Sequence, residues 1–422
     1  MPSFPRLEQN LKTDVLVIGG GMAGLLCAFF LKQAGVDYAL IEADRICGGI
    51  TRNTTAKLTS QHGLIYGKLI QQFGQGTARQ YWDANEAALA RFRHLASIIP
   101  CDFETKDAYV YEVGQTEKLE QELHGLEQLH IPAEYLDQIP LPFPVAGAIR
   151  FSGQAQFHPL KFAAGIASGL HVYEHTPARE FAPKTVTTPH GIITADKIII
   201  ATHFPILNKH GSYFLKLYQH RSYVLALEDA PRLDGMYIDE SETGLSLRSY
   251  GNLLLLGGGS HRTGKSGGGW KLLESVQHRY FPNAQEKCRW ATQDCMSLDG
   301  VPYIGAYSKH APNLYVASGF HKWGMTGSMA AAMVLTDLVQ EKRNPYKSLF
   351  SPSRSILRPQ LFINTYEATK HLLKPTRPRC PHMGCALKWN PQEHSWDCPC
   401  HGSRFTKYGT LMDNPATGNI HM

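Results

Sequence analysis

The segment TDVLVIGGGMAGLLCAFFLKQAG, residues 13–35, decides the fold of the N-terminal part of this 422-residue chain. Its first apolar run, Asp14 to Ile18, predicts a short buried strand. Leu25 to Gln33 have a helical composition, and Gly35 follows where such a helix would end. Between the strand and the helix, three glycines have the spacing G-x-G-x-x-G. They are Gly19, Gly21 and Gly24.

Each glycine of this motif has a physical role in binding a dinucleotide. The first permits a tight turn, the second lets a pyrophosphate approach the backbone, and the third lets the helix and the strand pack closely. The N–H groups at the start of the helix attract phosphate oxygens. A second strand, Tyr38 to Ile41, ends at an acid whose carboxylate can accept hydrogen bonds from ribose hydroxyls. The segment therefore predicts a dinucleotide site with contacts from Gly19, Gly21, Met22, Ala23, Gly24, Glu42 and Ala43.

Four later blocks resemble the D-amino-acid-oxidase and glycine-oxidase superfamily of FAD enzymes, in the order of that family. They are Gly48–His62, which is similar to the flavin-facing loop, Lys197–His203, Ser297–Gly305 with the pattern D-G-x-P-x-I-G, and Asn313–Gly327. The resemblance implies that the dinucleotide is FAD. It also implies further cofactor contacts from Gly49, Thr51, Thr55, Ala178, Ala201, Thr202, Gly300, Gly324, Met325 and Thr326.

The same resemblance implies an α/β (α+β) fold for residues 1–345, in which a Rossmann-like FAD-binding domain carries an antiparallel sheet that forms the substrate pocket. The FAD-binding parts are expected at about 10–75, 150–205 and 295–340, and the sheet parts at about 76–149 and 206–294. Alternating patterns broken by Gly and Pro agree with the sheet. Helices are predicted over residues 79–98, 119–129 and 325–339, and two strands joined by a turn over residues 185–195.

Three polar residues, Lys57, Gln61 and His62, lie in the loop that the resemblance places near the flavin ring. They are the tentative catalytic residues. Lys57 would stabilise reduced flavin or polarise a substrate. The alternative is that the three side chains brace the loop through hydrogen bonds. The resemblance requires no other base, because flavin oxidations in this superfamily often use a substrate that arrives deprotonated.

The end of the chain carries four of the nine cysteines, in the segments Cys380–Cys385 and Cys398–His401. The spacing is C-x-H, fifteen residues, then C-x-x-H. It resembles the Rieske motif, in which two cysteines hold one iron of a [2Fe–2S] cluster and two histidines hold the other. The resemblance implies the ligands Cys380, His382, Cys398 and His401, and a disulfide between Cys385 and Cys400.

A structural zinc site is the alternative for this region. The four cysteines, alone or mixed with the histidines, would supply a tetrahedral set of ligands. However, zinc ribbons usually carry C-x-x-C pairs, whereas this chain has C-x₄-C and C-x-C. The spacing therefore favours the iron–sulfur cluster.

Residues 346–379 predict a basic linker with a helix near Leu361–Leu373. Residues 341–380 contain nine Lys or Arg and two Asp or Glu, a net charge of +7. This segment is either a solvated connector or a strip that docks an acidic electron-transfer partner. Only about 40 residues separate the predicted helix 325–339 from Cys380, so residues 380–422 are predicted to form a truncated Rieske module without most of the usual β base. A module of this size needs its metal, a disulfide or a neighbouring domain to fold.

The bulk composition, 43% hydrophobic and 18% charged, is typical of a globular protein. No apolar run approaches the roughly 20 residues of a membrane span. The N-terminus lacks the basic and apolar pattern of a secretion signal, so a cytoplasmic protein is expected. The basic residues are not interleaved with stacking aromatic residues, which argues against nucleic-acid binding.

Together these features predict an FAD-dependent oxidoreductase that oxidises a small substrate, such as an amine or amino acid. Electrons would pass singly from FAD to the Rieske cluster and on to an external electron carrier. Two alternatives stay open: a reductase that runs electrons from the cluster to the flavin, and a non-catalytic redox sensor or assembly protein. An oligomer is compatible with the sequence.

Overall fold

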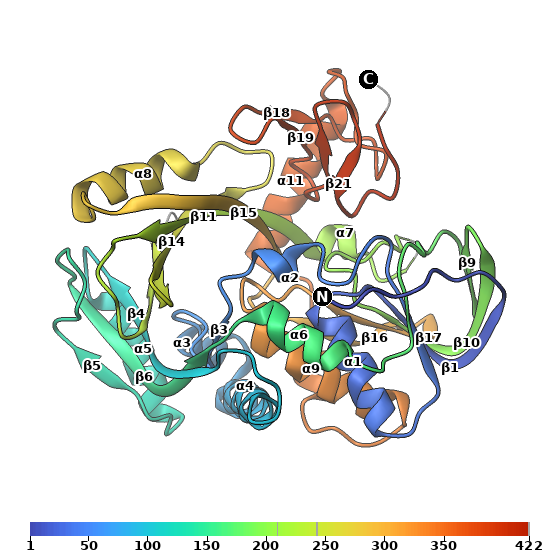
Figure 1. The fold of residues 1–422 in the computed structure, drawn as a ribbon, viewed down its shortest axis with the longest axis horizontal. Helices are drawn as coiled ribbons and strands as arrows, with labels where there is room; N and C mark the ends of the chain where they lie inside the picture. Colours follow the sequence, from blue (N-terminus) through green and yellow to red (C-terminus); the bar gives the residue numbers. More distant parts are fainter. Residues whose placement is uncertain (209, 242–243, 421–422) are drawn as a thin grey trace.

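The computed structural model describes residues 1–208, 210–241 and 244–420. Two large sheets lie next to each other, and a small third sheet near the C-terminus lies above them (Figure 1). The chain crosses between the two large sheets several times, so neither is built from one continuous segment.

The first sheet is mostly parallel. Its strands are β1 (Leu11–Ile18), β2 (Tyr38–Ile41), β7 (Val172–Tyr173), β8 (Phe181–Ala182), β9 (Thr185–Thr188), β10 (Gly191–Ile200), β16 (Tyr303–Ser308) and β17 (Ala311–Ser318). The order is β16-β17-β10-β1-β2-β7, and the β8–β9 hairpin extends from β10. All four residues of β2 are buried, as expected for a parallel strand that is covered on both faces.

The second sheet is mostly antiparallel. Its strands are β3 (Lys57–Leu58), β4 (Glu104–Glu112), β5 (Glu134–Leu136), β6 (Gly147–Gln156), β11 (Leu217–Glu228), β12 (Met236–Asp239), β13 (Ser246–Tyr250), β14 (Leu253–Arg262) and β15 (Gln285–Ser297). The order is β15-β11-β14-β13-β12-β4-β6-β3, with β5 paired to β6. The long strands β11 and β15 form one edge of this sheet.

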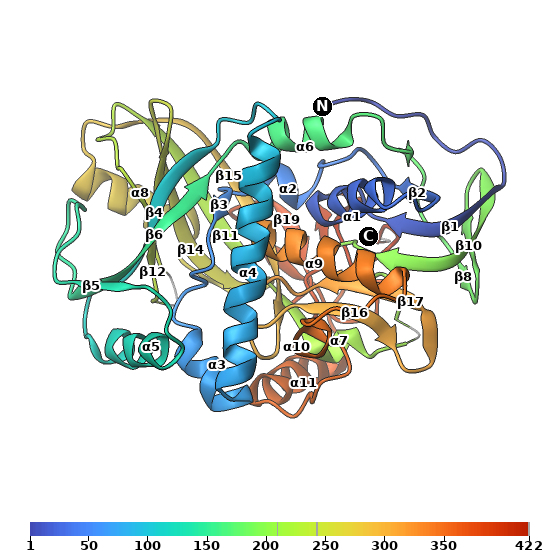
Figure 2. The same cartoon turned by 90° about the horizontal axis from the view of Figure 1, so that it is seen from below.

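Helices cover the sheets and fill the space between them. They are α1 (Met22–Gln33), α2 (Ile50–Asn53), α3 (Tyr66–Phe73), α4 (Gln75–Ala96), α5 (Glu117–Gln128), α6 (Pro159–Ala167), α7 (Tyr213–Lys216), α8 (Gly269–Tyr280), α9 (Gly324–Val339), α10 (Lys347–Phe350) and α11 (Pro359–Leu373). Helices α1 and α9 pack against each other in the main core. Figure 2 shows α4 running between this pair and the second sheet. Within the described residues, no helix is both long and apolar enough to span a membrane.

The third sheet belongs to the C-terminal module. Its strands are β18 (Lys388–Asn390), β19 (Ser395–Asp397), β20 (Arg404–Thr406) and β21 (Leu411–Asp413), paired in that order. Its small core contains the four terminal cysteines with Leu387, Phe405, Ala416 and Ile420. So small a core cannot exclude water on every side, which makes the contact with the larger part of the chain important.

The predicted fold class is confirmed, and the predicted helices and the β9–β10 hairpin form within a few residues of their expected ends. The proposed boundaries divide the chain less cleanly than expected. Strand β3 lies within residues 10–75 but belongs to the second sheet, and β6 crosses the boundary at residue 150. Helix α4, assigned to the substrate part, packs on α9 of the FAD part. The register of strand pairing and the packing of the helices decide which part of the fold each element joins. Neither can be inferred from the amino-acid composition of a segment.

The aromatic cluster under α4 allows a test of this packing. The Phe92 ring is fully buried and lies 5.4 Å from the Phe157 ring and 5.0 Å from the Phe162 ring, between centroids. We expect Phe92→Ala to lower the free energy of unfolding by about 3–5 kcal/mol, because it leaves a cavity. The matched control is Ile98→Ala. Ile98 is 69% exposed, and this change should stay within about 0.5 kcal/mol of the parent protein. Equal midpoints in urea unfolding for the two variants would contradict this packing.

Candidate active site and cluster site

The glycine motif forms a turn that no larger residue could make. Gly19 has a φ of +108°, and a Cβ at this position would lie 2.6 Å from the carbonyl oxygen of Ala201. A Cβ on Gly24 would lie 1.8 Å from the carbonyl oxygen of Gly19, because α1 crosses β1 so closely. Helix α1 begins after Gly21, which supplies no side-chain cap, and the Met22 N–H donates to Thr51 Oγ1 at 3.0 Å. The start of the helix, at Gly21, Met22 and Ala23, lines the cavity, as a pyrophosphate site requires.

The predicted ribose acid, Glu42, stands at the end of β2 and lines the cavity. Its Oε2 accepts a hydrogen bond from the Gly20 N–H at 2.6 Å, and its Oε1 accepts one from the Asp44 N–H at 3.0 Å. Burial raises the pKa of this carboxyl group. These two backbone hydrogen bonds fix the carboxylate beside the glycine turn, where a ribose hydroxyl would reach it.

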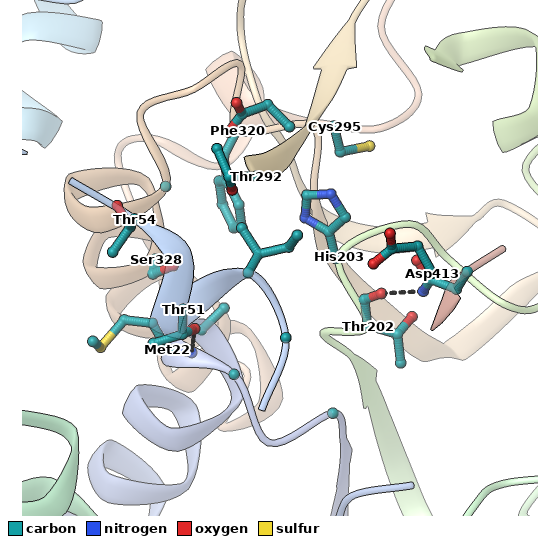
Figure 3. A pocket seen from close by; sticks show the side chains of 18 of the residues that line it. Met22, Thr51, Thr54, Thr202, His203, Thr292, Cys295, Phe320, Ser328 and Asp413 are labelled. Carbon is teal, nitrogen blue, oxygen red and sulfur yellow. Dashed lines mark hydrogen bonds between the residues drawn. The ribbon is translucent and has the colours of Figure 1, made fainter. Parts of the chain in front are cut away.

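A cavity of about 760 Å³ extends from this turn towards the second sheet. Figure 3 shows Met22 and Thr51 on one side of it and Thr202, His203 and Asp413 on another. Fourteen of the predicted cofactor contacts line the cavity: Gly19, Gly21, Met22, Ala23, Glu42, Ala43, Gly49, Thr51, Thr55, Ala178, Ala201, Thr202, Gly324 and Met325. Three do not line it, namely Gly24, Gly300 and Thr326. Gly24 acts in helix–strand packing, and Thr326 faces His62 instead.

The start of α9 provides a second helix N-terminus at this cavity. Gly324 and Met325 line the cavity, and no side chain caps the helix. Unpaired N–H groups at a helix N-terminus stabilise nearby negative charge. The residues of this cavity therefore fit FAD: one helix start can receive the phosphates, and another can receive the charge of a reduced ring.

The tentative catalytic residues separate into two groups. Lys57 lines the cavity, and its Nζ donates to Ser246 Oγ at 2.5 Å. Gln61 and His62 are buried outside the cavity lining. Gln61 Nε2 donates to the Ile149 carbonyl at 3.0 Å, and the His62 ring hydrogen-bonds with Tyr81 at 2.6 Å. For these two residues the geometry agrees with the bracing role, which leaves Lys57 as the candidate at the cavity.

Several charged residues of the cavity were not among the predicted site residues, and two of them lie close to the predicted flavin loop and helix. Asp294, on β15, and Lys322, just before α9, both line the cavity. Lys322 Nζ donates to Ser260 Oγ at 2.9 Å. Burial raises the pKa of Asp294 and lowers that of Lys322. Lys322 lies within the block Asn313–Gly327, but the resemblance of that block did not single out its lysine, and Asp294 lies outside the quoted blocks.

The predicted cluster ligands come together in the C-terminal module. The side chains of Cys380 and Cys398 are both buried in the small core of this module. The rings of His382 and His401 lie 4.9 Å apart between centroids. The Nδ1 atom of each ring is buried and, within the described residues, has no hydrogen-bond partner. Two buried, unpartnered imidazole nitrogens beside two thiols fit the donor set of a Rieske [2Fe–2S] cluster.

A second grouping of sulfur atoms lies in the same place. The Sγ atoms of Cys385, Cys398 and Cys400 lie within 4.8 Å of one another. Cys385 and Cys400 are not bonded to each other in this structure, so their disulfide stays a prediction. The assignment of the two histidines as ligands likewise rests on their free nitrogens and on the motif, and a three-cysteine set would leave both nitrogens unexplained.

Side chains of the second sheet hold the module through its backbone. Gln219 Nε2 donates to the His401 carbonyl at 2.8 Å, and Gln293 Nε2 donates to the Gly402 carbonyl at 2.9 Å. Gly402 has a φ of +86°, and a Cβ there would lie 2.6 Å from the Gln219 side chain. Arg262 donates to two further carbonyls of the second ligand loop. None of these three contact residues was predicted, since a lone Gln or Arg on a strand carries no recognisable signal.

The histidine side of the module faces the cavity. The Phe204 ring lies 6.2 Å from both the His382 and the His401 rings, between centroids. The residues just before Phe204 line the cavity, and so do residues of β21 and the turn after it: Leu411, Met412, Asp413, Asn414, Ala416 and Thr417. The cluster module thus forms part of the wall of the predicted flavin site.

Comparison with known proteins gives the class of this chain. The family of FAD dependent oxidoreductases, DAO, matches residues 14–338, and the Rieske [2Fe-2S] domain matches residues 354–422. The chain therefore belongs to the DAO family of FAD-dependent oxidoreductases and carries a C-terminal Rieske domain. The Rieske match begins before α11, so it includes the helix of the predicted linker.

Individual relatives agree with this assignment. YhfW of Bacillus subtilis (strain 168), named as a Rieske 2Fe-2S iron-sulfur protein, is 34% identical over 99% of this chain and 94% of its own length. The gamma-glutamylputrescine oxidoreductase of Escherichia coli (strain K12) is 28% identical over 47% of this chain and 50% of its own length. The crystal structure of glycine oxidase from Geobacillus kaustophilus superposes with a TM-score of 0.70, at 20% identity, over 82% of this chain and all of that chain.

Substitution of single ligands separates the two sulfur groupings. We expect Cys380→Ser and His382→Ala to reduce the iron content from about two atoms per chain to almost none and to abolish the Rieske EPR signal. Cys385→Ser and Cys400→Ser should retain the signal. The control is Cys288→Ser at an exposed cysteine. Loss of iron in Cys385→Ser together with full iron in His382→Ala would show that the three-cysteine set is the metal site.

Proposed function

We propose that this protein oxidises a small amine or amino acid at the flavin and delivers the electrons singly through its Rieske cluster to an external carrier. The observation that carries the proposal is the shared cavity. Its wall contains the glycine turn of the first sheet, Lys57 and Asp294 of the second sheet, and residues 411–414, 416 and 417 of the cluster module. When bound, FAD accepts two electrons from a substrate and can release them one at a time, which a one-electron cluster requires.

The charges at the second-sheet end of the cavity support an amine-bearing substrate. Asp294 lines the cavity with a carboxyl group that, when ionised, can pair with an ammonium group. Lys57 and Lys322 offer two nitrogen donors for a substrate carboxylate or carbonyl oxygen. The name of the Escherichia coli relative, which specifies an amine derivative, agrees with this substrate class. The three side chains would orient such a substrate and replace its water shell with fixed polar groups.

Anaerobic titration of the purified protein with a panel of amines and amino acids tests the proposed function. A true substrate should bleach the flavin absorbance and then produce the EPR signal of a reduced Rieske cluster. A control sample of the His382→Ala variant should show bleaching without the EPR signal. Flavin reduction by NADH or by a reduced carrier, but by no member of the panel, would support the opposite direction of electron flow and contradict the proposal.

Lys57 predicts the pH dependence of the first step. Burial, and then the nearby Arg248, lower the pKa of Lys57 to about 7. The amine is therefore increasingly neutral above pH 7, where it can accept a proton from a substrate ammonium group. We expect the rate of flavin reduction to rise about tenfold from pH ~6 to pH ~8 and then to level off.

Replacement of Lys57 tests whether this residue causes the pH dependence of flavin reduction. Lys57→Met should slow flavin reduction by about 100-fold and remove the inflection, and Lys57→Arg should also remove it, because arginine stays charged. Lys68→Met, at an exposed lysine of α3, is the matched control and should leave the profile unchanged. An inflection near pH 7 that persists in Lys57→Met would assign the titration to the substrate or to another group.

A further inference from the structure

Helix α11 has the reverse of the usual amphipathic pattern. The side facing the protein is polar: Asn364, Glu367 and His371 are each 4–5% exposed. Asn364 Oδ1 accepts a hydrogen bond from Arg262 Nη1 at 2.8 Å, and Glu367 forms an ion pair with Lys265. A helix normally buries its apolar side chains, so a polar side that faces the protein needs an explanation.

The outward side of α11 is apolar. Phe362, Ile363, Tyr366 and Leu373 are 69%, 49%, 63% and 78% exposed. Tyr366 lies four residues after Phe362, three after Ile363 and seven before Leu373, so the four side chains form one continuous stripe along the helix. Figure 2 shows α11 along the lower edge of the molecule. Scattered exposed apolar residues are ordinary, but a contiguous stripe of large side chains marks a surface that binds something.

Basic side chains follow the same stripe. Lys370 lies on it, and its Nζ is 5.7 Å from the centroid of the Tyr366 ring. Lys374 and Arg377 come directly after the helix, and all three are exposed and make no ion pair within the described part of the chain. The two acids of residues 341–380 are already engaged, Glu341 with Lys197 and Glu367 with Lys265. The positive charge of this surface is therefore not neutralised by its own segment.

The end of α11 is joined to the first ligand loop of the cluster. Arg379 Nε donates to the Gly384 carbonyl at 2.8 Å, and its Nη2 donates to the Leu372 carbonyl at 2.6 Å. The Ala386 N–H donates to the His371 carbonyl at 2.9 Å. The histidine side of the module faces inward, towards Phe204. Met383, which directly follows the predicted ligand His382 in the first ligand loop, is 36% exposed.

We infer that the outward stripe of α11, with Lys370, Lys374, Arg377 and the exposed part of the first ligand loop, is the docking surface for a small acidic electron-carrier protein. This inference rests on the proposed function and names the partner of that site. Apolar contact supplies affinity at the centre of such an interface, and complementary charge around it steers the encounter. None of the residues of this surface lines the cavity, so a docked carrier leaves the substrate site accessible.

The position of Lys370 favours a protein over a lipid surface. An interfacial helix presents an apolar face to the acyl chains and keeps its lysines on the opposite, polar face. In α11 the opposite face is packed against the protein, and Lys370 lies within the apolar stripe itself. A charge in that position is matched by a carboxylate of a partner protein. A second copy of this chain would bring a second positively charged stripe, which would repel the first.

Electron delivery to a carrier of known charge tests this surface without a substrate. The full-length holoprotein is reduced with dithionite, freed of excess reductant and mixed anaerobically with an acidic blue-copper protein as the probe. Each productive encounter moves one electron to one Cu(II) ion and forms Cu(I), with no proton or group transferred. The second-order rate constant is followed through loss of the blue absorbance as the ionic strength is varied.

The expected results are specific to the surface. The rate constant for the parent protein should fall about tenfold between ~10 mM and ~150 mM salt. K370E/K374E/R377E should lower the low-salt value by about tenfold or more and should raise the value for a basic cytochrome c. F362S/Y366S should lower it several-fold at every salt concentration. The control K12E/K271E/K309E makes the same change in net charge at exposed lysines elsewhere and should preserve the salt dependence.

Flavin absorbance and the reduced-cluster EPR signal, measured for every variant, show that each protein is intact. Equal rate constants for the two triple-charge variants would overturn the docking surface, whatever the substrate screen shows. Binding to vesicles of anionic phospholipid that is lost in K370E/K374E/R377E, with an unchanged probe rate, would assign the stripe to a membrane instead. A dimer in sedimentation that F362S/Y366S dissociates would assign it to a second copy and would also overturn the inference.

Discussion

A network of buried charges joins the cluster module to the larger part of the chain. Arg221 of the second sheet pairs with Glu393, which also pairs with Arg404 at 2.8 Å. Arg404 in turn pairs with Asp397 at 3.0 Å and with Asp413 at 3.1 Å. Buried charges are stabilising only when every member has partners in good geometry. The module can therefore keep these charges buried only while it is docked, which makes its position a condition of its fold.

This docking also completes the cavity. Asn414 donates hydrogen bonds to the Thr202 and Phe204 carbonyls. These bonds fix the turn after β10 and the cluster module relative to each other. Residues 411–414, 416 and 417 then form part of the wall of the predicted FAD site, and the Phe204 ring lies near both predicted histidine ligands. The predicted FAD site and the predicted cluster site, which come from two separate families, therefore lie next to each other. The short β base of the module is consistent with this arrangement, because the second sheet supplies the support that a full Rieske domain provides for itself.

The parts of the site that depend on local geometry were predictable. Gly19 and Gly24 had to be glycines because a Cβ would meet the backbone, and Glu42 followed from its place at the end of a strand. The predicted helix in the linker also formed, as α11. The side chains that face the cavity were less predictable. Lys57 lines it, whereas Gln61 and His62, four and five residues further on, turn into the core. The chain bends after β3, and the spacing of residues in the sequence does not reveal the direction of that bend.

The sequence by itself determined the two cofactor classes. A close approach of two backbone segments admits only glycine, and iron ligation requires cysteine and histidine at fixed separations. Both requirements therefore produce motifs that can be recognised in a short segment of sequence. Only the tertiary structure decided how the two sites meet. Gln219, Gln293 and Arg262 bind the backbone of the second ligand loop from strands more than a hundred residues away. Such contacts are set by sheet register and by hydrogen bonds to carbonyl groups, which every residue carries, and they therefore leave no pattern in the chain.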